Sequence, residues 1–521
     1  MRAEVAIVGA GIGGLTSAAL LAARGHKVTV IEKEAWVGGK ARGVEVDGAA
    51  IAGGPTVFTM REVFEEVFAA CGEALDDRIA ARPAEIIARH AWDAAETLDL
   101  FADPARSEAA IGDFAGAREA RAYRAFRAEA KRIFEVLEEP FLRGDSASSP
   151  LPMIWRMGPA RMGDAMAMRP FDILWKALGQ HFSDPRLQQL FGRYATYCGS
   201  DPFQAPATLM LIAHTEAKGV WLIEGGIHAL ARALRGLAER CGAQVRLGEP
   251  VSEVLTDGAK VRGLRLASGE DIPADIVISN ADPAALSTGA LGARARRAVA
   301  HMPAAKRSLS AYVWYAHGET SGFDLSHHNV FFSRDYAREF REIAQGRPPS
   351  EPTVYICAQD RAATLAPGPA PEGRERLQII VNAPANGDTH THSDKEIEAC
   401  TKAMRSTLER CGLSLEADAP RTVMTPSAWE SLFPATGGAL YGRASHGWAA
   451  SFQRQGPRTR IRGLYCTGGA THPAAGVPMA ALSGQLAARV VCSDLASTRT
   501  SRPAAIPGGT STRSPRTGST A

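Results

Sequence analysis

The sequence predicts an α/β protein with more than one domain, and three observations lead to that prediction. The chain is 521 residues long, which is more than one hydrophobic core usually organises. Its first 32 residues contain two strand-like apolar runs separated by a glycine-rich turn and a helical stretch. Short strand-like and helical segments then occur along the rest of the chain. A strand, a helix and a second strand in succession are typical of α/β folds.

The chain begins with a strand, a glycine-rich turn and a helix. Residues 5–8 are apolar and read as a buried parallel strand, and residues 15–23 read as a helix. Between them, Gly9, Gly11 and Gly14 match the spacing G-x-G-x-x-G. The first glycine permits a tight turn, the second lets a pyrophosphate approach the backbone, and the third lets the helix pack closely on the strand. The free N–H groups and the positive dipole of the helix N-terminus favour phosphate there.

An acidic residue follows the second strand. Residues 27–31 form another apolar run, and Glu32 comes directly after it, where a carboxylate accepts hydrogen bonds from an adenosine ribose. The alternative is a glycine-rich helix N-terminus in an ordinary α/β core. The strand, turn, helix and acid at these distances favour a dinucleotide site in a Rossmann-like domain.

The distribution of charge argues against a nucleic-acid-binding protein. The formal net charge is +3, but the last 25 residues hold four arginines and no acid, which leaves residues 1–496 at −1. The eight cysteines are scattered and include no C-x-x-C pair, so neither a disulfide framework nor a zinc site is expected, and a reducing cytoplasm fits. His390 and His392 are expected in a loop rather than at a metal. The sequence therefore predicts no metal site and no nucleic-acid partner.

Two segments bear on membrane contact. Residues 5–23 lack charge, but the strand, turn and helix account for them, so no targeting segment is expected. No other run of about 20 apolar residues occurs, so no membrane span is expected. Residues 153–175 gather five of the 12 methionines with Trp155, Trp175 and three arginines. This segment is either a helical core or an apolar lip that rests on a membrane and admits a long apolar substrate.

Several sequence blocks, taken in order, resemble a known family. They are residues 32–42 (Glu-Lys-Glu-Ala-Trp-Val-Gly-Gly-Lys-Ala-Arg), 54–58, 219–230, 279–283 and 468–479. Together they are similar to the phytoene-desaturase-type carotenoid oxidoreductases, which are FAD enzymes related to the amine oxidases. Within that family, residues 54–61 and the body of the chain look closest to the bacterial 1-hydroxycarotenoid 3,4-desaturases.

The resemblance implies a discontinuous Rossmann-like FAD-binding domain and a mixed α+β substrate domain. The FAD-binding domain would comprise residues 1–105, 219–300 and 456–496. The substrate and membrane-contact domain would comprise residues 106–218 and 301–455. Residues 497–521, rich in Ser, Thr, Pro and Arg, cannot bury a core and are expected to be disordered.

The resemblance also assigns cofactor-binding residues. Gly39 and the basic residues Lys40 and Arg42 would approach the FAD phosphates, with Lys40 standing where the family commonly has arginine. Val251 would meet the adenine end. The C-terminal block would run under the ribityl chain and the flavin ring. Its expected contacts are Gly469, Val477 and Met479. The family often has Asp where this chain has Ala52, so no role is assigned to that position.

The implied reaction is desaturation of a carotenoid C–C bond, specifically C3–C4 of an acyclic 1-hydroxycarotenoid. Carotenoid C–H bonds are barely acidic, but the polyene stabilises an allylic cation. We therefore expect hydride transfer to flavin N5 and proton loss from the adjacent carbon, with the cofactor carrying the difficult chemistry. His472 is the candidate catalytic group beside the flavin; alternatively, it braces the turn before Pro473.

Several alternatives stay open. On the same scaffold, the chain could be a phytoene desaturase or another carotenoid oxidoreductase. An amine oxidase is disfavoured because the C-terminal block offers no aromatic residue, and a non-catalytic prenyl-chain escort protein is disfavoured by the intact phosphate-binding glycines. Because a carotenoid is insoluble in water, we expect a cytoplasmic protein in peripheral contact with the inner face of a membrane. The choice of electron acceptor, oxygen or a quinone, is left open, as are the oligomeric state and the number of bonds desaturated.

Overall fold

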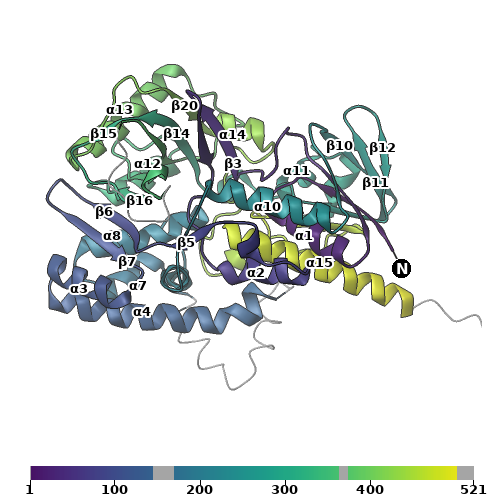
Figure 1. Ribbon diagram of the computed structural model, residues 1–521, viewed down its shortest axis with the longest axis horizontal. Helices are drawn as coiled ribbons and strands as arrows, with labels where there is room; N and C mark the ends of the chain where they lie inside the picture. The colour runs from purple at the N-terminus through teal and green to yellow at the C-terminus, as the bar shows by residue number, and fades with distance from the viewer. Residues whose placement is uncertain (1, 145–168, 170, 363–372, 501–521) are drawn as a thin grey trace, which may run out of the picture.

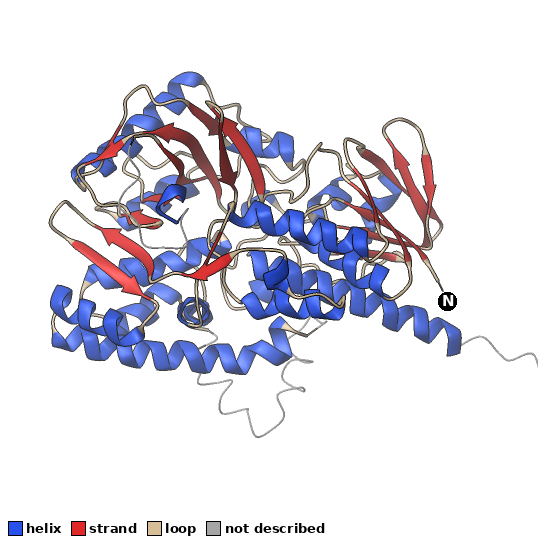
Figure 2. Ribbon diagram, in the orientation of Figure 1, coloured by secondary structure: helices blue, strands red, loops and turns tan. Residues whose placement is uncertain are grey.

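The computed structural model describes residues 2–144, 169, 171–362 and 373–500 of the chain (Figures 1 and 2). A five-stranded parallel sheet forms the centre of the first part, in the order β21-β13-β1-β2-β9. Its strands come from three distant stretches of chain: β1 (Glu4–Val8), β2 (Lys27–Ile31), β9 (Gln244–Arg246), β13 (Ile276–Ser279) and β21 (Leu464–Cys466). The predicted α/β class is confirmed, and the parallel sheet is discontinuous in sequence.

Helix α1 (Ile12–Ala23) packs against both α10 (Gly226–Arg240) and α15 (Val477–Thr500). The Ser17 hydroxyl donates to the Gly484 carbonyl at 3.1 Å, and a Cβ on Gly484 would lie 2.6 Å from the carbonyl oxygen of Gly13. Small residues therefore bring the backbones of α1 and α15 into contact, which attaches the C-terminal block to the glycine turn. Helix α15 continues to Thr500, past the predicted boundary at residue 496, and the rest of the predicted tail, 501–521, lies outside the described residues.

A three-stranded antiparallel sheet joins the first part. It consists of β10 (Val251–Asp257), β11 (Lys260–Leu266) and β12 (Asp271–Pro273). Strands β9 and β13, which flank this small sheet in the sequence, pair with the parallel sheet instead.

The second part is built on a seven-stranded sheet in the order β20-β14-β18-β17-β16-β6-β7. Its strands are β6 (Ile86–Ala91), β7 (Thr97–Phe101), β14 (Ser310–Gly318), β16 (His328–Phe331), β17 (Val354–Ala358), β18 (Glu375–Ala383) and β20 (Arg421–Met424). Helix α13 (Asp394–Arg410) supplies Cys400, Met404 and Leu408 to the apolar core that it shares with this sheet. All pairings are antiparallel except that of β16 with β6.

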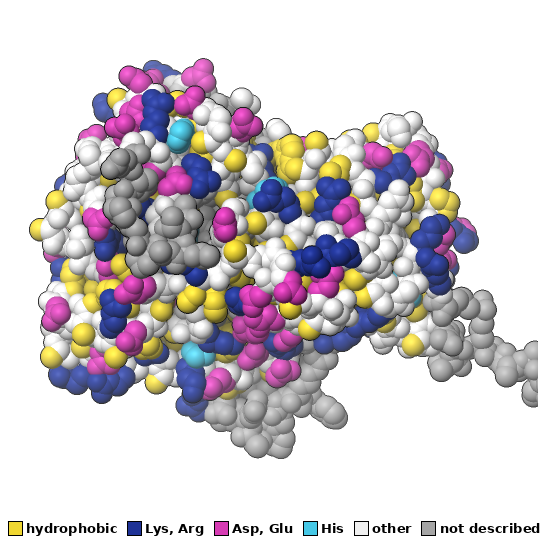
Figure 3. All heavy atoms as spheres, in the orientation of Figure 1, with side chains coloured by type: hydrophobic (Ala, Val, Ile, Leu, Met, Phe, Trp, Pro, Cys, Tyr) yellow, Lys and Arg dark blue, Asp and Glu magenta, His cyan; other side chains and the backbone are white. Residues whose placement is uncertain are grey.

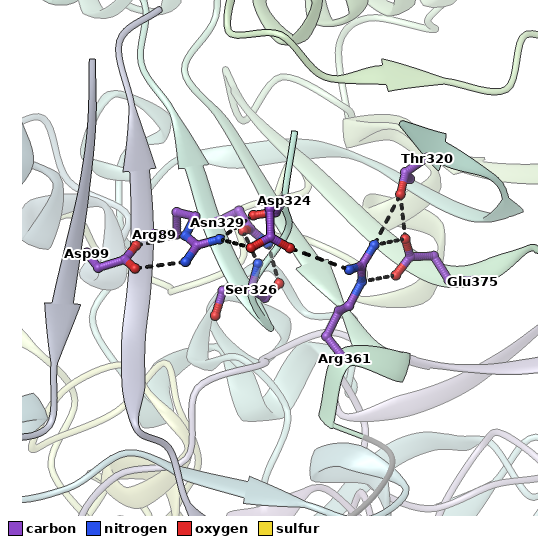
Figure 4. A network of polar contacts seen from close by, with 8 residues as sticks. All are labelled: Arg89, Asp99, Thr320, Asp324, Ser326, Asn329, Arg361 and Glu375. Atoms are coloured by element: carbon purple, nitrogen blue, oxygen red, sulfur yellow. Dashed lines mark hydrogen bonds and ion pairs between the residues drawn. The ribbon is translucent and has the colours of Figure 1, made fainter. Parts of the chain in front are cut away.

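Strands β6 and β7 lie within residues 1–105, the stretch expected to belong to the FAD-binding domain, yet β6 pairs with β16 in the second part. Figure 4 shows why the hairpin stays there: Arg89 forms ion pairs with Asp99 on β7 and with Asp324 before β16, both at 2.8 Å. Arg361 extends the network to Glu375 on β18 at 2.9 Å. The charges tie the hairpin to the edge of the larger sheet.

Helices from the middle of the chain lie below the seven-stranded sheet in Figures 1 and 2. Residues 104–142 form α3 (Pro104–Ala115), α4 (Ala117–Leu137) and a π-helical turn (Glu138–Leu142), with Gly116 at φ 95° separating the first two. The other helices here are α7 (Leu174–His181), α8 (Pro185–Gly192) and α9 (Leu211–Ala217). Most of the methionine-rich segment, 153–168 and 170, lies outside the described residues.

Shorter elements complete the fold. They are β3 (Arg42–Val46), β4 (Ala49–Gly53), α2 (Arg61–Ala70), β5 (Ala81–Pro83), β8 (Trp221–Ile223), α11 (Pro283–Thr288), β15 (Thr320–Ser321), α12 (Tyr336–Ala344), β19 (Ser414–Leu415) and α14 (Pro426–Leu432). Charged side chains of both signs are interspersed over the face seen in Figure 3. Across the described ranges, the model contains no helix with the length and apolarity needed to cross a bilayer.

Candidate active site

One cavity of about 690 Å³ is lined by residues from both parts of the molecule. Its volume lies within the roughly 300–1,000 Å³ typical of small-molecule sites. One side consists of the glycine turn, residues 38–42 and the C-terminal block, and another consists of side chains from the helices and the seven-stranded sheet. The predicted cofactor-binding residues that line it are Gly9, Gly11, Glu32, Gly39, Lys40, Arg42, Val251, Gly469, Val477 and Met479.

The glycine turn has a geometry that side chains would obstruct. Gly9 adopts φ +95°, and a Cβ on Gly14 would lie 2.3 Å from the carbonyl oxygen of Gly9. Gly14 does not line the cavity; its N–H donates to Asn280 Oδ1 at 3.0 Å. Helix α1 begins after Gly11 without a side-chain cap. The turn therefore leaves its backbone accessible to a phosphate, while Gly14 serves the packing of helix on strand.

Glu32 is buried where β2 ends and also lines the cavity. Its carboxylate accepts hydrogen bonds from the backbone N–H of Ala10 at 2.7 Å and of Glu34 at 3.0 Å. Burial raises the pKa of this carboxyl, and the two N–H donors partly oppose that rise. The side chain thus fixes the loops around the glycine turn and keeps a carboxylate at the cavity wall.

Two cations, the buried Arg42 and the partly buried Lys40, provide positive charge beside the turn. Arg42 is 9 % exposed, its guanidinium lies 5.7 Å from the ring centre of Trp429, and its Nε has no hydrogen-bond partner among the described residues. Lys40 donates to the carbonyl of Leu440, and burial lowers its pKa to about 8, although Asp282 opposes the fall. A buried donor without a partner is costly unless a ligand completes it, so these residues fit a bound diphosphate.

His472 lies beside the cavity rather than at its surface. The ring is fully buried and is not among the lining residues, although the next residue, Pro473, is. Its Nε2–H donates to the carbonyl of Gly144 at 2.8 Å, and the ring meets Phe141 edge-on at 5.1 Å. The hydrogen bond links the turn before Pro473 to Gly144, which follows the π-helical turn at residues 138–142.

Several residues at the site were assigned no role from the sequence. Asn280 and Asp282 lie in the block 279–283. Asn280 accepts a hydrogen bond from the glycine turn, and Asp282 caps helix α11 and interacts electrostatically with Lys40. Arg454 is buried on the cavity wall and donates to the carbonyls of Tyr441 and Arg443. Asn280 and Asp282 lie in a sequence block that resembles the family, whereas no sequence pattern singles out Arg454. Aromatic residues do reach the cavity, from 429–452 and from other segments (Trp36, Phe141, Tyr197, Tyr336 and Tyr355), but not from the C-terminal block.

Among the described residues, His327, His328 and Cys357 form the one group whose ligand atoms could meet at a metal ion. Burial raises the pKa of the Cys357 thiol to about 12, and that thiol already contacts His327 Nε2 at 3.4 Å. A metal ligand must be the thiolate, so burial disfavours a cation here.

The fold and the cavity define the class of the protein, an FAD-dependent oxidoreductase. The chain belongs to the family of flavin-containing amine oxidoreductases, whose family model matches residues 12–492. Over its whole length it is similar to particular members. It is 48 % identical over 519 residues to the hydroxyneurosporene desaturase of Rubrivivax gelatinosus. The aligned region covers 99 % of this chain and 98 % of that relative.

Further relatives extend this comparison. The hydroxyneurosporene desaturase of Cereibacter sphaeroides is 43 % identical, covering 95 % of this chain and 98 % of the relative. The zeta-carotene-forming phytoene desaturase of Myxococcus xanthus is 29 % identical, covering 93 % and 92 %. Among solved structures, an oxidoreductase from Methanosarcina mazei has a TM-score of 0.57 at 16 % identity, covering 92 % and 99 %. Putrescine oxidase bound to putrescine has a TM-score of 0.53 at 15 % identity, covering 95 % and 99 %, and these two likenesses show the fold alone.

Proposed function

We propose that this protein desaturates the C3–C4 bond of an acyclic 1-hydroxycarotenoid, with FAD as the oxidant. The observation that carries the proposal is the cavity, in which the phosphate-binding turn and an apolar wall share one space. The names of the relatives that are 43–48 % identical support a hydroxylated carotenoid as the substrate. The relatives named for phytoene or zeta-carotene are more distant, at 28–30 %.

The residues of the chain anchor the cofactor and shape the space beside it. A bound flavin supplies a two-electron oxidant. Gly9, Gly11 and Arg42 would hold its phosphates, and helix α15, which begins at Val477 on the cavity wall, directs its positive dipole end toward the cavity. Much of the remaining wall is apolar, and it excludes water from the polyene; it includes Leu137, Phe141, Leu142, Leu209, Ile212, Val330 and Ile380.

The proposed reaction is tested by anaerobic reduction of the flavin. A 1-hydroxylated acyclic carotenoid should bleach the flavin absorbance of the purified protein, and its product should carry one additional conjugated double bond. Phytoene should bleach it more slowly. Bleaching by phytoene alone would instead identify a phytoene desaturase, and a flavin that no carotenoid bleaches would identify an escort protein. Reoxidation of the bleached enzyme by oxygen or by a quinone then identifies the electron acceptor.

We also propose peripheral contact with the inner face of a membrane. Phe171, Ile173 and Trp448 are large apolar side chains exposed by 66 %, 42 % and 48 %, and Phe171 meets Trp448 edge-on at 5.5 Å. Trp448 also lines the cavity, so this apolar patch adjoins the space that would receive the substrate.

Liposome flotation tests the membrane contact. Phe171→Glu combined with Trp448→Glu should abolish flotation with anionic liposomes, because two charges would enter the apolar contact. The control is Gln345→Glu, which adds charge at an exposed position that is not one of the three patch residues. If the double variant floats as the wild type does, these residues do not make the contact.

A further inference from the structure

A buried arginine lies on the substrate side of the cavity. Arg193 begins a 3₁₀ helix (Arg193–Cys198), lines the cavity and is only 6 % exposed. Its Nη1 donates to the hydroxyl of Tyr197 at 3.0 Å. Its Nε and Nη2 are buried and have no hydrogen-bond partner among the described residues. Two donor atoms of a permanent cation therefore remain available to a ligand.

A carboxylate balances this arginine through tyrosine hydroxyls. Glu216, on α9, is 3 % exposed and also lines the cavity. It accepts hydrogen bonds from the hydroxyls of Tyr194 and Tyr197, both at 2.6 Å. The guanidinium stacks near the same two rings, at 5.7 Å and 5.0 Å from their centres. This arrangement fixes the position of the charge, since every partner of Arg193 is itself held by Glu216.

Another polar group of the cavity wall is already paired. The Tyr355 hydroxyl lies 2.6 Å from Thr56 Oγ1 and 2.7 Å from His328 Nδ1. The wall also includes the apolar side chains of Leu209, Leu211 and Ile212. A hydrocarbon chain would satisfy those apolar side chains but would leave two charged donors buried without a partner, which is costly.

We propose that Arg193, supported by Tyr197 and Glu216, is the subsite that binds the oxygen at the end of an acyclic carotenoid substrate. The terminal hydroxyl oxygen accepts hydrogen bonds from Nε and Nη2 of Arg193, and the hydroxyl O–H donates a hydrogen bond to the Glu216 carboxylate. This inference rests on the proposed desaturase function and specifies how the enzyme selects its substrate. A substrate without the terminal hydroxyl leaves the Arg193 donors without a hydrogen-bond acceptor, so the enzyme prefers the hydroxylated carotenoid. Sites built around a substrate hydroxyl reject analogues that lack it far more strongly than apolar pockets reject a missing methylene.

The test compares two substrates of equal conjugated length, one with and one without the terminal hydroxyl. For each, the dependence of anaerobic flavin bleaching on carotenoid concentration gives an apparent dissociation constant and a limiting rate. Arg193→Met should lower the preference for the hydroxylated substrate by roughly 10- to 100-fold, because a charge-assisted hydrogen bond is lost. The loss should lie mainly in the apparent dissociation constant. The matched control is Arg127→Met, since Arg127 also stacks on a tyrosine, at 5.7 Å from the Tyr123 ring, but does not line the cavity.

Arg193→Lys is the second variant, in case Arg193→Met does not fold or does not retain flavin. Lysine keeps the charge but loses the planar fork, so an intermediate loss of preference is expected. A preference equal to that of the wild type in a flavin-containing Arg193→Met or Arg193→Lys protein would overturn the inference and leave the proposed function intact. If the wild type itself bleaches with neither carotenoid, the proposed function is wrong, and the two failures are thereby distinguished.

Discussion

The proposed cofactor-binding wall and the proposed substrate wall of the cavity are built in different ways. On the first, backbone atoms approach one another so closely that only glycine fits, as at Gly14 against the Gly9 carbonyl. On the second, side chains from α4, α9, the seven-stranded sheet and residues 429–452 meet without any shared spacing. A cofactor of fixed shape constrains the backbone and leaves a pattern in the sequence. A substrate chosen by a few side chains leaves no such pattern, because many sequences can supply them.

The largest effect is expected from Gly14→Ala, because Gly14 packs against Gly9 of the cofactor wall. The added Cβ would lie 2.3 Å from a backbone oxygen, which no side-chain movement relieves, so helix α1 must shift away from β1. We expect a loss of roughly 100-fold or more in flavin affinity and about 3 kcal/mol of stability. Flavin content after purification and thermal unfolding measure both.

The matched control is Gly112→Ala on helix α3. There the new Cβ makes only an ordinary contact, 3.5 Å from Ala120 Cβ, and alanine favours the helix by about 0.5–1 kcal/mol. The control should therefore bind flavin normally and unfold at an equal or higher temperature. If both variants retain flavin equally, backbone crowding does not explain the glycine turn.

The same contrast explains how far the sequence predicts the structure. The strand over 27–31, the helix after Gly11 and the C-terminal block could be predicted because each has its own local pattern, and ten of the predicted cofactor contacts line one cavity. Strands β6 and β7 could not be assigned to their sheet, because pairing with β16 joins residues more than 200 positions apart. Arg193 and Glu216 are close in sequence, but they could not be paired because they are related through Tyr197 only in the folded structure.

The second expected effect concerns Arg42, which stands on the cofactor wall but acts through its side chain. Arg42→Met removes a buried cation whose Nε is open toward a ligand, and flavin affinity should fall by roughly 10- to 100-fold. Arg42→Lys should restore part of the loss, because it returns charge without the fork. Titration of apoprotein with FAD gives the affinities, and an unchanged affinity in Arg42→Met would contradict a phosphate contact.

The third effect is a pH dependence set by Lys40. Burial lowers its pKa to about 8 from the ordinary 10.5, whereas bound phosphates would raise it again. Below pH 8 the ammonium is present with or without flavin. Above pH 8, binding requires proton uptake, so affinity should fall by up to about tenfold per pH unit.

The stability of the apoprotein should change in the opposite direction over the same interval. Between pH 8 and 10.5 the unfolded chain binds the Lys40 proton and the folded chain does not, so the free energy of unfolding contributed by this group rises with pH. Lys40→Arg, which stays charged, should flatten the flavin-affinity profile. A profile equally steep in Lys40→Arg would assign the pH dependence to another group.

The smallest effect on activity is expected from substitution of His472, which does not line the cavity. Its Nε2–H is committed to the Gly144 carbonyl at 2.8 Å, and the ring lies behind the cavity surface. His472→Ala would leave that carbonyl without this donor and create a buried gap, which costs about 1–3 kcal/mol of stability. Turnover per bound flavin should stay within about threefold of the wild type, because no reacting atom is touched. A loss of turnover of 100-fold or more with flavin fully bound would instead place the imidazole among the catalytic groups. The cofactor wall would then act on the substrate through a side chain as well as through its backbone.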